Sequence, residues 1–204
     1  MDLESRVGVF GGTFDPIHLG HLVAAEEARI CFRLSEVLFV PAGTPWHRGS
    51  RPVTDAHRRL DMLRLSIAAN PHFRLSTVDV DRQGPTYTVD TLQALRQERG
   101  AAARFYFLIG MDALAEIKTW KDPAILINLC HLLIMPRPGH EAFDISSLEP
   151  DLPGLTERVS VLPMPLLGIS STDLRHRVRQ GLPIRYQVTD QVEAYIAEHG
   201  LYKD

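Results

Sequence analysis

Two histidines lie close behind a glycine-rich segment near the start of the chain. Residues 11–21 are Gly-Gly-Thr-Phe-Asp-Pro-Ile-His-Leu-Gly-His, and they follow the apolar run Val-Gly-Val-Phe at 7–10. Glycines let backbone N–H groups approach an anion closely, a helix N-terminus adds partial positive charge, and imidazoles donate hydrogen bonds to phosphate oxygens. The segment therefore predicts a strand, a turn and a helix start that bind phosphates through His18 and His21. The chemistry to expect is transfer between phosphates.

A second candidate anion site lies late in the chain, at residues 169–175. The residues Ile-Ser-Ser-Thr at 169–172 begin a predicted helix, and Arg175 follows one turn later. Hydroxyls and N–H groups at a helix start, with a guanidinium nearby, suit phosphate oxygens. Taken alone, the same pattern is typical of an ordinary helix N-cap, so it supports a phosphate site only together with the first segment.

Both segments need a scaffold that brings their helix starts together. Short β-branched or aromatic runs alternate with longer amphipathic runs, which is typical of a parallel sheet covered by helices. The predicted strands are Arg6–Phe10, Glu36–Val40, Phe73–Val80, Arg104–Ile109, His131–Met135 and Arg158–Leu162. The predicted helices are Leu19–Phe32, Asp55–Ala69, Val89–Arg99, Pro123–Leu129, Ser171–Gln180 and Asp190–Glu198. Thr54 is the expected cap of the second helix.

The fold class that follows is α/β, a Rossmann-like doubly wound and mainly parallel sheet with helices on both faces. In such a sheet ligands bind at the carboxyl ends of the strands, near the point where the strand order reverses. With 204 residues, of which 45% are apolar, the chain can bury one good core. We therefore expect a single domain over residues 1–204, with a C-terminal helical segment from about 171 to 204.

The amino-acid composition limits the classes of partner that we expect for this protein. The formal net charge of −3 argues against a general nucleic-acid binder. Arginines gather instead at 48–59 and 175–179, where they suit phosphate recognition or form a solvated helix face. No apolar run approaches the roughly 20 residues of a membrane span and no signal peptide is recognisable, so we expect a cytoplasmic protein without membrane contact.

The two cysteines, Cys31 and Cys130, lie far apart in apolar sequence and predict buried, reduced thiols. A histidine pair at this helical spacing is also compatible with half of a zinc site or with plain surface. Because neither cysteine has ligand spacing, we expect no metal site made by the protein.

The first segment resembles the GxFDPxHxGH signature of the nucleotidyltransferase superfamily of adenylyl- and cytidylyltransferases, and residues 169–175 resemble its second signature. The resemblance implies that His18 and His21 contact the phosphates of a nucleoside triphosphate. It also implies that the β- and γ-phosphates of ATP are bound by Ser170, Ser171, Thr172 and Arg175. It further implies in-line attack at the α-phosphorus without a general base. Charge would be neutralised by His18, His21, Arg48 and Arg175 and by a Mg²⁺ held mainly by the triphosphate.

Residues 81–92, Asp-Arg-Gln-Gly-Pro-Thr-Tyr-Thr-Val-Asp-Thr-Leu, are similar to the GPSYTxDTL string of bacterial nicotinate-nucleotide adenylyltransferases. The loop at 41–48 resembles the Pro-x-x-x-Pro-Pro-His-Lys loop of that branch, with Trp46 for the second proline and Arg48 for the lysine. The resemblance implies that backbone donors around Thr86 and Tyr87 receive a nicotinate carboxylate.

Two more segments resemble superfamily motifs. Residues 110–114 match Gly-x-Asp-x-Leu and are followed by Trp120, although Lys121 stands where the family often has an aromatic residue. Arg137 lies in a turn similar to the family's Arg-Pro-Gly. The resemblance implies that Asp112 accepts hydrogen bonds from ribose hydroxyls and that Trp120 stacks on a pyridine ring, although Trp120 also fits a core position.

The implied sites are as follows. The ATP site comprises Gly11, Gly12, Thr13, Phe14, His18, His21, Gly110, Asp112, Arg137, Ile169, Ser170, Ser171, Thr172 and Arg175. The nicotinate mononucleotide site comprises Gly12, Arg48, Thr86, Tyr87 and Trp120.

We therefore expect transfer of an adenylyl group from ATP to nicotinate mononucleotide, giving nicotinate adenine dinucleotide and pyrophosphate, a step of NAD biosynthesis. Two alternatives stay open. One is phosphopantetheine adenylyl transfer, which is disfavoured because such chains are shorter and lack the string at 84–92. The other is a non-catalytic nucleotide sensor of the same fold, which could dispense with the histidines. A homo-oligomer is compatible with the sequence.

Overall fold

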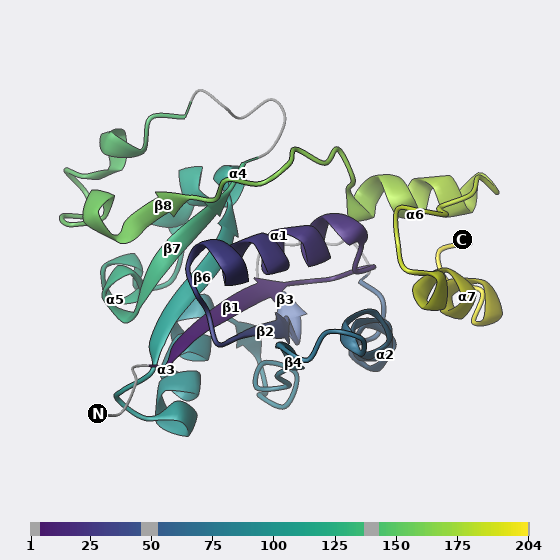
Figure 1. Cartoon of the computed structure of the whole chain (residues 1–204), viewed down its shortest axis with the longest axis horizontal. Coiled ribbons are helices and arrows are strands. Elements are labelled where there is room, and N and C mark those ends of the chain that lie inside the picture. The colour runs from purple at the N-terminus through teal and green to yellow at the C-terminus, as the bar shows by residue number, and fades with distance from the viewer. Residues whose placement is uncertain (1–4, 46–52, 137–142, 204) are drawn as a thin grey trace.

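The structure is a computed structural model that describes residues 5–45, 53–136 and 143–203. Its centre is a parallel sheet of six strands in the order β4-β2-β1-β6-β7-β8 (Figure 1). The strands are β1 (Arg6–Gly12), β2 (Glu36–Pro41), β4 (Phe73–Leu75), β6 (Arg104–Gly110), β7 (Cys130–Met135) and β8 (Val159–Val161). The chain adds β2 and β4 on one side of β1 and then crosses to β6 on the other side. The strand order therefore reverses between β1 and β6, which confirms a doubly wound sheet.

Helices lie on both faces of this sheet (Figure 1). They are α1 (Leu19–Cys31), α2 (Ala56–Ile67), α3 (Thr88–Arg99), α4 (Met111–Ala115), α5 (Pro123–Leu129), α6 (Ser171–Arg179) and α7 (Asp190–Glu198). Three short 3₁₀ turns cover Ile117–Thr119, Ile145–Leu148 and Thr156–Arg158, and a separate two-stranded pair joins β3 (Thr44–Pro45) to β5 (Pro85–Thr86). None of the described helices is both long enough and apolar enough to span a membrane.

The four central strands, β1, β2, β6 and β7, contribute to two hydrophobic clusters, one on each face of the sheet. In β2, Leu38 and Val40 pack with α3 and α5, whereas Val37 and Phe39 pack with α1, α2 and the C-terminal helices. Successive side chains of a strand point to opposite faces, so a strand buried on both faces must be apolar at every position. This requirement explains the continuous apolar runs from which the strands were predicted.

One predicted strand end and one predicted helix cap are wrong, whereas the other predicted ends lie within two residues of the observed ones. The expected strand Phe73–Val80 ends at Leu75, because the amide of Ser76 still bonds to the Phe39 carbonyl but the chain then turns, with Asp81 N–H donating to the Thr77 carbonyl. The second helix is capped by Asp55, whose carboxylate accepts from the His57 amide, and not by Thr54.

The prediction of two buried thiols is correct for Cys130 and wrong for Cys31. The buried face of α1 is formed by Ala24, Ala25 and Ala28, and Cys31 ends the helix beyond that face. Both thiols are free.

Candidate active site

A cavity of about 320 Å³ opens at the carboxyl ends of β1, β2, β6 and β7. It therefore lies at the point where the strand order reverses, which is where open α/β sheets bind ligands. The starts of α1, α3, α4 and α6 contribute to its wall as well. Residues from both ends of the chain, Gly11–Thr13 and Ser170–Thr172, meet in this wall.

Most of the residues predicted from the sequence line this cavity. They are Gly11, Gly12, Thr13, Phe14, His18, His21, Thr86, Gly110, Asp112, Trp120, Ser170, Ser171 and Thr172. Three predicted residues, Tyr87, Ile169 and Arg175, are described by the structure but do not belong to the wall. Arg48, Trp46 and Arg137 lie outside the described residues.

The two histidines form one unit at the start of α1. Their rings are stacked with centroids 3.6 Å apart, and the backbone N–H of His18 donates to Nδ1 of His21 over 3.2 Å. Since Nδ1 of His21 accepts this bond, the proton of the neutral ring lies on Nε2, where it can be donated to a ligand. His18 is the N-cap residue of α1, so the helix start itself carries both rings.

Two glycines of the signature leave room for ring atoms. A Cβ on Gly20 would lie 3.0 Å from Nδ1 of His18, and a Cβ on Gly12 would lie 3.1 Å from the ring of Phe14. Both distances are tighter than ordinary carbon contacts. The glycines thus permit the close packing that holds the histidine and phenylalanine rings against the turn.

The turn between β1 and α1 is fixed from below by Arg59, whose side chain is only 1% exposed. Its guanidinium donates to the carbonyls of Thr54, Thr13 and Ala42 at 2.8, 2.9 and 2.8 Å, and to that of Gly43 at 3.3 Å. From the sequence, the arginines at 48–59 were expected to bind phosphate or to form a solvated helix face. Both predictions are wrong for Arg59. It ties the loop after β1 to the loop after β2 and to the start of α2.

The start of α6 reaches the cavity wall through residues 170–172, and N–H groups at a helix start are a suitable partner for an anion. Ser170 caps the helix by accepting from the Asp173 amide at 3.1 Å. Ser171 donates its hydroxyl to the Pro16 carbonyl at 2.8 Å. This bond attaches the second predicted phosphate segment directly to the first.

Arg175 lies beneath the cavity and is buried. Its guanidinium donates to the Asp15 carbonyl at 2.6 Å and to Oγ1 of Thr172 at 3.3 Å. In this conformation the side chain holds the turn and the helix start together.

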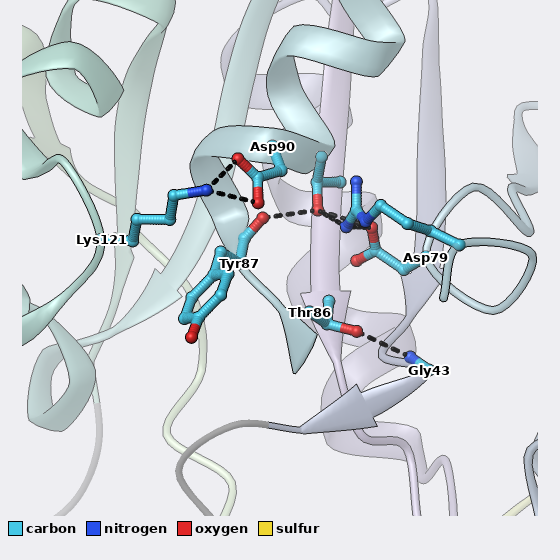
Figure 2. A network of polar contacts seen from close by, with 8 residues as sticks. Gly43, Asp79, Thr86, Tyr87, Asp90 and Lys121 are labelled. Carbon is cyan, nitrogen blue, oxygen red and sulfur yellow. Dashed lines mark hydrogen bonds and ion pairs between the residues drawn. The ribbon is translucent and has the colours of Figure 1, made fainter. Parts of the chain in front are cut away.

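The predicted mononucleotide segment packs against the loop after β2 (Figure 2). Thr86 lies in β5, which pairs with β3, and its Oγ1 accepts from the amide of Gly43 at 3.1 Å. A Cβ on Gly43 would collide with the Asp79 carbonyl, so glycine is needed for this close approach. Thr86 and Thr88 both line the cavity, and α3 begins at Thr88.

Tyr87 is the N-cap residue of α3 and packs against the hydrophobic core. Nζ of Lys121 lies 5.1 Å from the centroid of its ring and bonds to both carboxylate oxygens of Asp90, at 2.8 and 3.0 Å (Figure 2). The hydrogen bond to Asp90 raises the pKa of Lys121. Lys121, the departure from the family pattern, therefore packs over Tyr87 at the start of α3.

Asp79 and Thr91 are cavity residues that the sequence did not indicate. Asp79 is 4% exposed; its Oδ1 accepts from the Thr91 hydroxyl at 2.7 Å and from Arg82 at 2.5 Å. Burial raises the pKa of the Asp79 carboxyl. The sequence feature that could have indicated Asp79 is its position between two valines. It was missed because residues 73–80 were expected to form a regular strand.

The opposite wall is formed by the end of β6 and the start of α4. Gly110 caps α4, and Asp112 lies in its first turn at the cavity. The ring of Trp120 meets that of Phe107 edge to face, with centroids 6.4 Å apart. Trp120 thus both lines the cavity and packs against the core, so the two roles that the sequence left open are compatible.

Within the parts of the chain that the structure describes, no three His, Cys, Asp or Glu side chains are grouped so that they could hold a metal ion. Besides the carboxylates of Asp79 and Asp112, the cavity wall contains two imidazoles and several serine and threonine hydroxyls. Such donors suit the oxygens of phosphates.

Comparisons with known proteins agree with this geometry. The model of the cytidylyltransferase-like family matches residues 9–177. The probable nicotinate-nucleotide adenylyltransferase of Moorella thermoacetica is 47% identical over 199 residues, covering 97% of this chain and 92% of the relative. That of Leifsonia xyli subsp. xyli is 50% identical over 198 residues, covering 97% and 94%.

Among solved structures, the nicotinic acid mononucleotide adenylyltransferase of Plasmodium falciparum is similar with a TM-score of 0.77. The similarity covers 97% of both chains at 22% identity, and that enzyme was solved in complexes with NaAD and with APC. At this level of identity the likeness shows the fold.

Proposed function

Because this chain belongs to the cytidylyltransferase-like family, and within it to the nicotinate-nucleotide adenylyltransferases, we propose that it transfers the adenylyl group of ATP to nicotinate mononucleotide. The products are nicotinate adenine dinucleotide and pyrophosphate. The observation that carries the proposal is that one cavity wall contains the histidine pair, the start of α6, Thr86 and Trp120.

The triphosphate lies between the two helix starts in this proposal. Nε2 of His21, the ring of His18 and the first N–H groups of α6 donate to its oxygens. A phosphate oxygen of nicotinate mononucleotide attacks the α-phosphorus in line, the new O–P bond forms, and the bond to the β-phosphate oxygen breaks as pyrophosphate leaves. The attacking phosphate is already an anion, so the chain supplies position and positive charge and no general base.

Mg²⁺ fits this site as part of the nucleotide. The donors in the wall are mostly N–H groups and hydroxyls, which match phosphate oxygens better than a cation, so the triphosphate itself would hold most of the ion. When bound, Mg²⁺ neutralises part of the charge on the leaving pyrophosphate. Arg48 and Arg137 remain proposed phosphate contacts, and Arg175 supports the site from beneath.

The mononucleotide occupies the side of the cavity formed by Thr86, Thr88 and Trp120. A nicotinate carboxylate gains from N–H groups at the start of α3, where the helix dipole favours negative charge, and the amide of nicotinamide gains less. The pyridine ring stacks on Trp120. Gly12 and Tyr87 complete the proposed mononucleotide contacts.

We also propose that residues 1–204 work as one nucleotidyltransferase domain in the cytoplasm. Helix α6 belongs to this unit because Ser171 and Arg175 hold the turn that carries the histidines, and α7 belongs to it because Tyr195 donates to Asp61 of α2. Independence from nucleic acids and the oligomeric state stay predictions.

Pyrophosphate release with ATP and Mg²⁺ tests the proposal. Nicotinate mononucleotide, nicotinamide mononucleotide and phosphopantetheine are compared at equal concentration. We expect a strong preference for nicotinate mononucleotide. Activity only with phosphopantetheine would replace the proposed acceptor, and ATP binding without turnover of any acceptor would indicate the nucleotide sensor.

A further inference from the structure

We propose that Tyr202 is a positioning residue for the phosphate-binding turn between β1 and α1. The inference rests on the proposed function, because it assigns a role in holding the groups that face the triphosphate. Tyr202 follows α7 and lies 187 positions from its partner Asp15 in the sequence. No sequence motif connects the two residues.

The contact is a hydrogen bond from the phenol of Tyr202 to Oδ1 of Asp15, over 2.8 Å. Asp15 is only 3% exposed, and its second oxygen accepts from the backbone N–H of Thr54 at 3.3 Å. Burial, followed by the neighbouring Asp15 carboxylate, raises the pKa of Tyr202 above its ordinary value. The phenol therefore keeps its proton and acts as the donor.

Asp15 occupies the centre of the turn that carries the proposed phosphate contacts. Phe14 before it and His18 after it line the cavity, whereas Asp15 does not. Its backbone carbonyl accepts from Arg175, and the next carbonyl, of Pro16, accepts from Ser171. The turn is thus held by α6 through its backbone and by Tyr202 through its one buried carboxylate.

The orientation of this carboxylate matters because the site binds anions. A buried carboxylate that loses a donor pays a large desolvation penalty and turns toward other N–H groups or cations. Such groups are present around the turn: the Arg175 guanidinium already donates to the Asp15 carbonyl, and His18 of the same turn lines the cavity. Either movement displaces the turn or brings negative charge toward the triphosphate, so Tyr202 keeps both the turn and the charge in place.

The test compares Tyr202→Phe with the matched variant Tyr195→Phe. Tyr195 also donates its phenol to an aspartate, Asp61 at 2.9 Å, and also joins the C-terminal region to the rest of the chain. It does not line the cavity, and its hydroxyl bonds to Asp61 and Arg58 of α2. Each variant removes one hydroxyl and keeps the ring. For each protein we would measure the KM and kcat of pyrophosphate release, the Kd of Mg·ATP by calorimetry, and the midpoint of urea unfolding.

We expect Tyr202→Phe to lower kcat/KM for ATP and to weaken Mg·ATP binding by about tenfold, with the KM for nicotinate mononucleotide within about twofold of the wild type. Tyr195→Phe should lose less stability, because its partner Asp61 is partly exposed and can be solvated by water, and it should keep wild-type kinetics and ATP affinity. Equal kinetics and equal ATP affinity in the two variants would overturn the inference.

Failure of the proposed function gives a different result. A wild-type chain that binds Mg·ATP but releases no pyrophosphate with nicotinate mononucleotide overturns the function. In that case the difference in Mg·ATP affinity between the two variants still decides the role of Tyr202, with weaker binding in Tyr202→Phe supporting it and equal binding overturning it.

Discussion

The imidazole rings of His18 and His21 stack with their centroids 3.6 Å apart, and Nδ1 of His21 accepts a hydrogen bond from the backbone N–H of His18. This bond assigns different tasks to the two nitrogens of His21. Nδ1 completes the start of α1, and Nε2 is the nitrogen that we propose donates to the ligand. The two tasks can be separated by substitution.

His21→Asn should keep the structural task and lose the chemical one. The asparagine oxygen can occupy the place of Nδ1 and accept from His18, but no donor remains at the place of Nε2. We expect thermal unfolding close to that of the wild type and a kcat lower by about a hundredfold, as is typical when a donor to developing charge is lost. His21→Gln, whose amide reaches the place of Nε2, should retain more activity than His21→Asn. Wild-type turnover in His21→Asn would remove His21 from the site.

Trp120→Ala should mainly weaken binding of the mononucleotide. If the indole stacks on the pyridine ring, we expect the KM for nicotinate mononucleotide to rise by a factor that corresponds to about 1–3 kcal/mol, with the KM for ATP nearly unchanged. Trp120→Phe keeps an aromatic face and the contact with Phe107, so it is the control. Its KM for nicotinate mononucleotide should lie between those of the wild type and Trp120→Ala. A large loss of stability with an unchanged KM would assign Trp120 to the core alone.

The elements of the sheet could be predicted because strands buried on both faces must be continuously apolar. Pro123–Leu129 and Asp190–Glu198 were predicted with their observed ends, since Pro123 at a first helical position and Thr189 before the last helix are strong start signals. The five-residue helix α4 and the two-residue strands β3 and β5 carry too few residues for any periodicity. They form because neighbouring segments pack against them.

Cavity residues were predictable where they belong to a short local motif and unpredictable where their partners are distant. The histidine pair and residues 170–172 lie at helix starts that the sequence itself signals. Arg59, by contrast, is bonded to backbone carbonyls, which every residue type possesses, so no pattern of side chains reveals it. Asp79 was missed because its role depends on where β4 ends.

The buried carboxyl of Asp79 predicts a defined dependence of stability on pH. Burial raises its pKa in the folded state above the ordinary value of 3.8, so the folded protein holds this proton more tightly than the unfolded chain does. The contribution of Asp79 to stability is therefore fully present below pH 3.8 and is lost as the pH rises through the raised pKa.

Asp79→Asn removes this titration and keeps an acceptor for Thr91. We expect the free energy of unfolding of the wild type, minus that of Asp79→Asn, to fall as the pH rises from below 3.8 to neutrality. Urea unfolding of both proteins over a series of pH values measures this difference. A difference that grows with pH would mean that the bonds from Arg82 and Thr91 outweigh burial and that the pKa is lowered.

Arg59 should be among the residues on which the stability of the loops most depends. Arg59→Met leaves several buried carbonyls without their donor, and each such group costs about 1–3 kcal/mol, so we expect a loss of about 3–5 kcal/mol in the free energy of unfolding. Arg64→Met is the matched control on the same helix, because Arg64 is exposed and forms only a surface ion pair with Asp61. Surface pairs of this kind contribute about 0–1 kcal/mol.

Arg59→Lys keeps the charge but reaches fewer carbonyls than the planar guanidinium does, so its stability should fall between those of the wild type and Arg59→Met. Urea unfolding of the three variants measures the series, and equal stability of Arg59→Met and Arg64→Met would show that the loops after β1 and β2 hold together without the buried guanidinium.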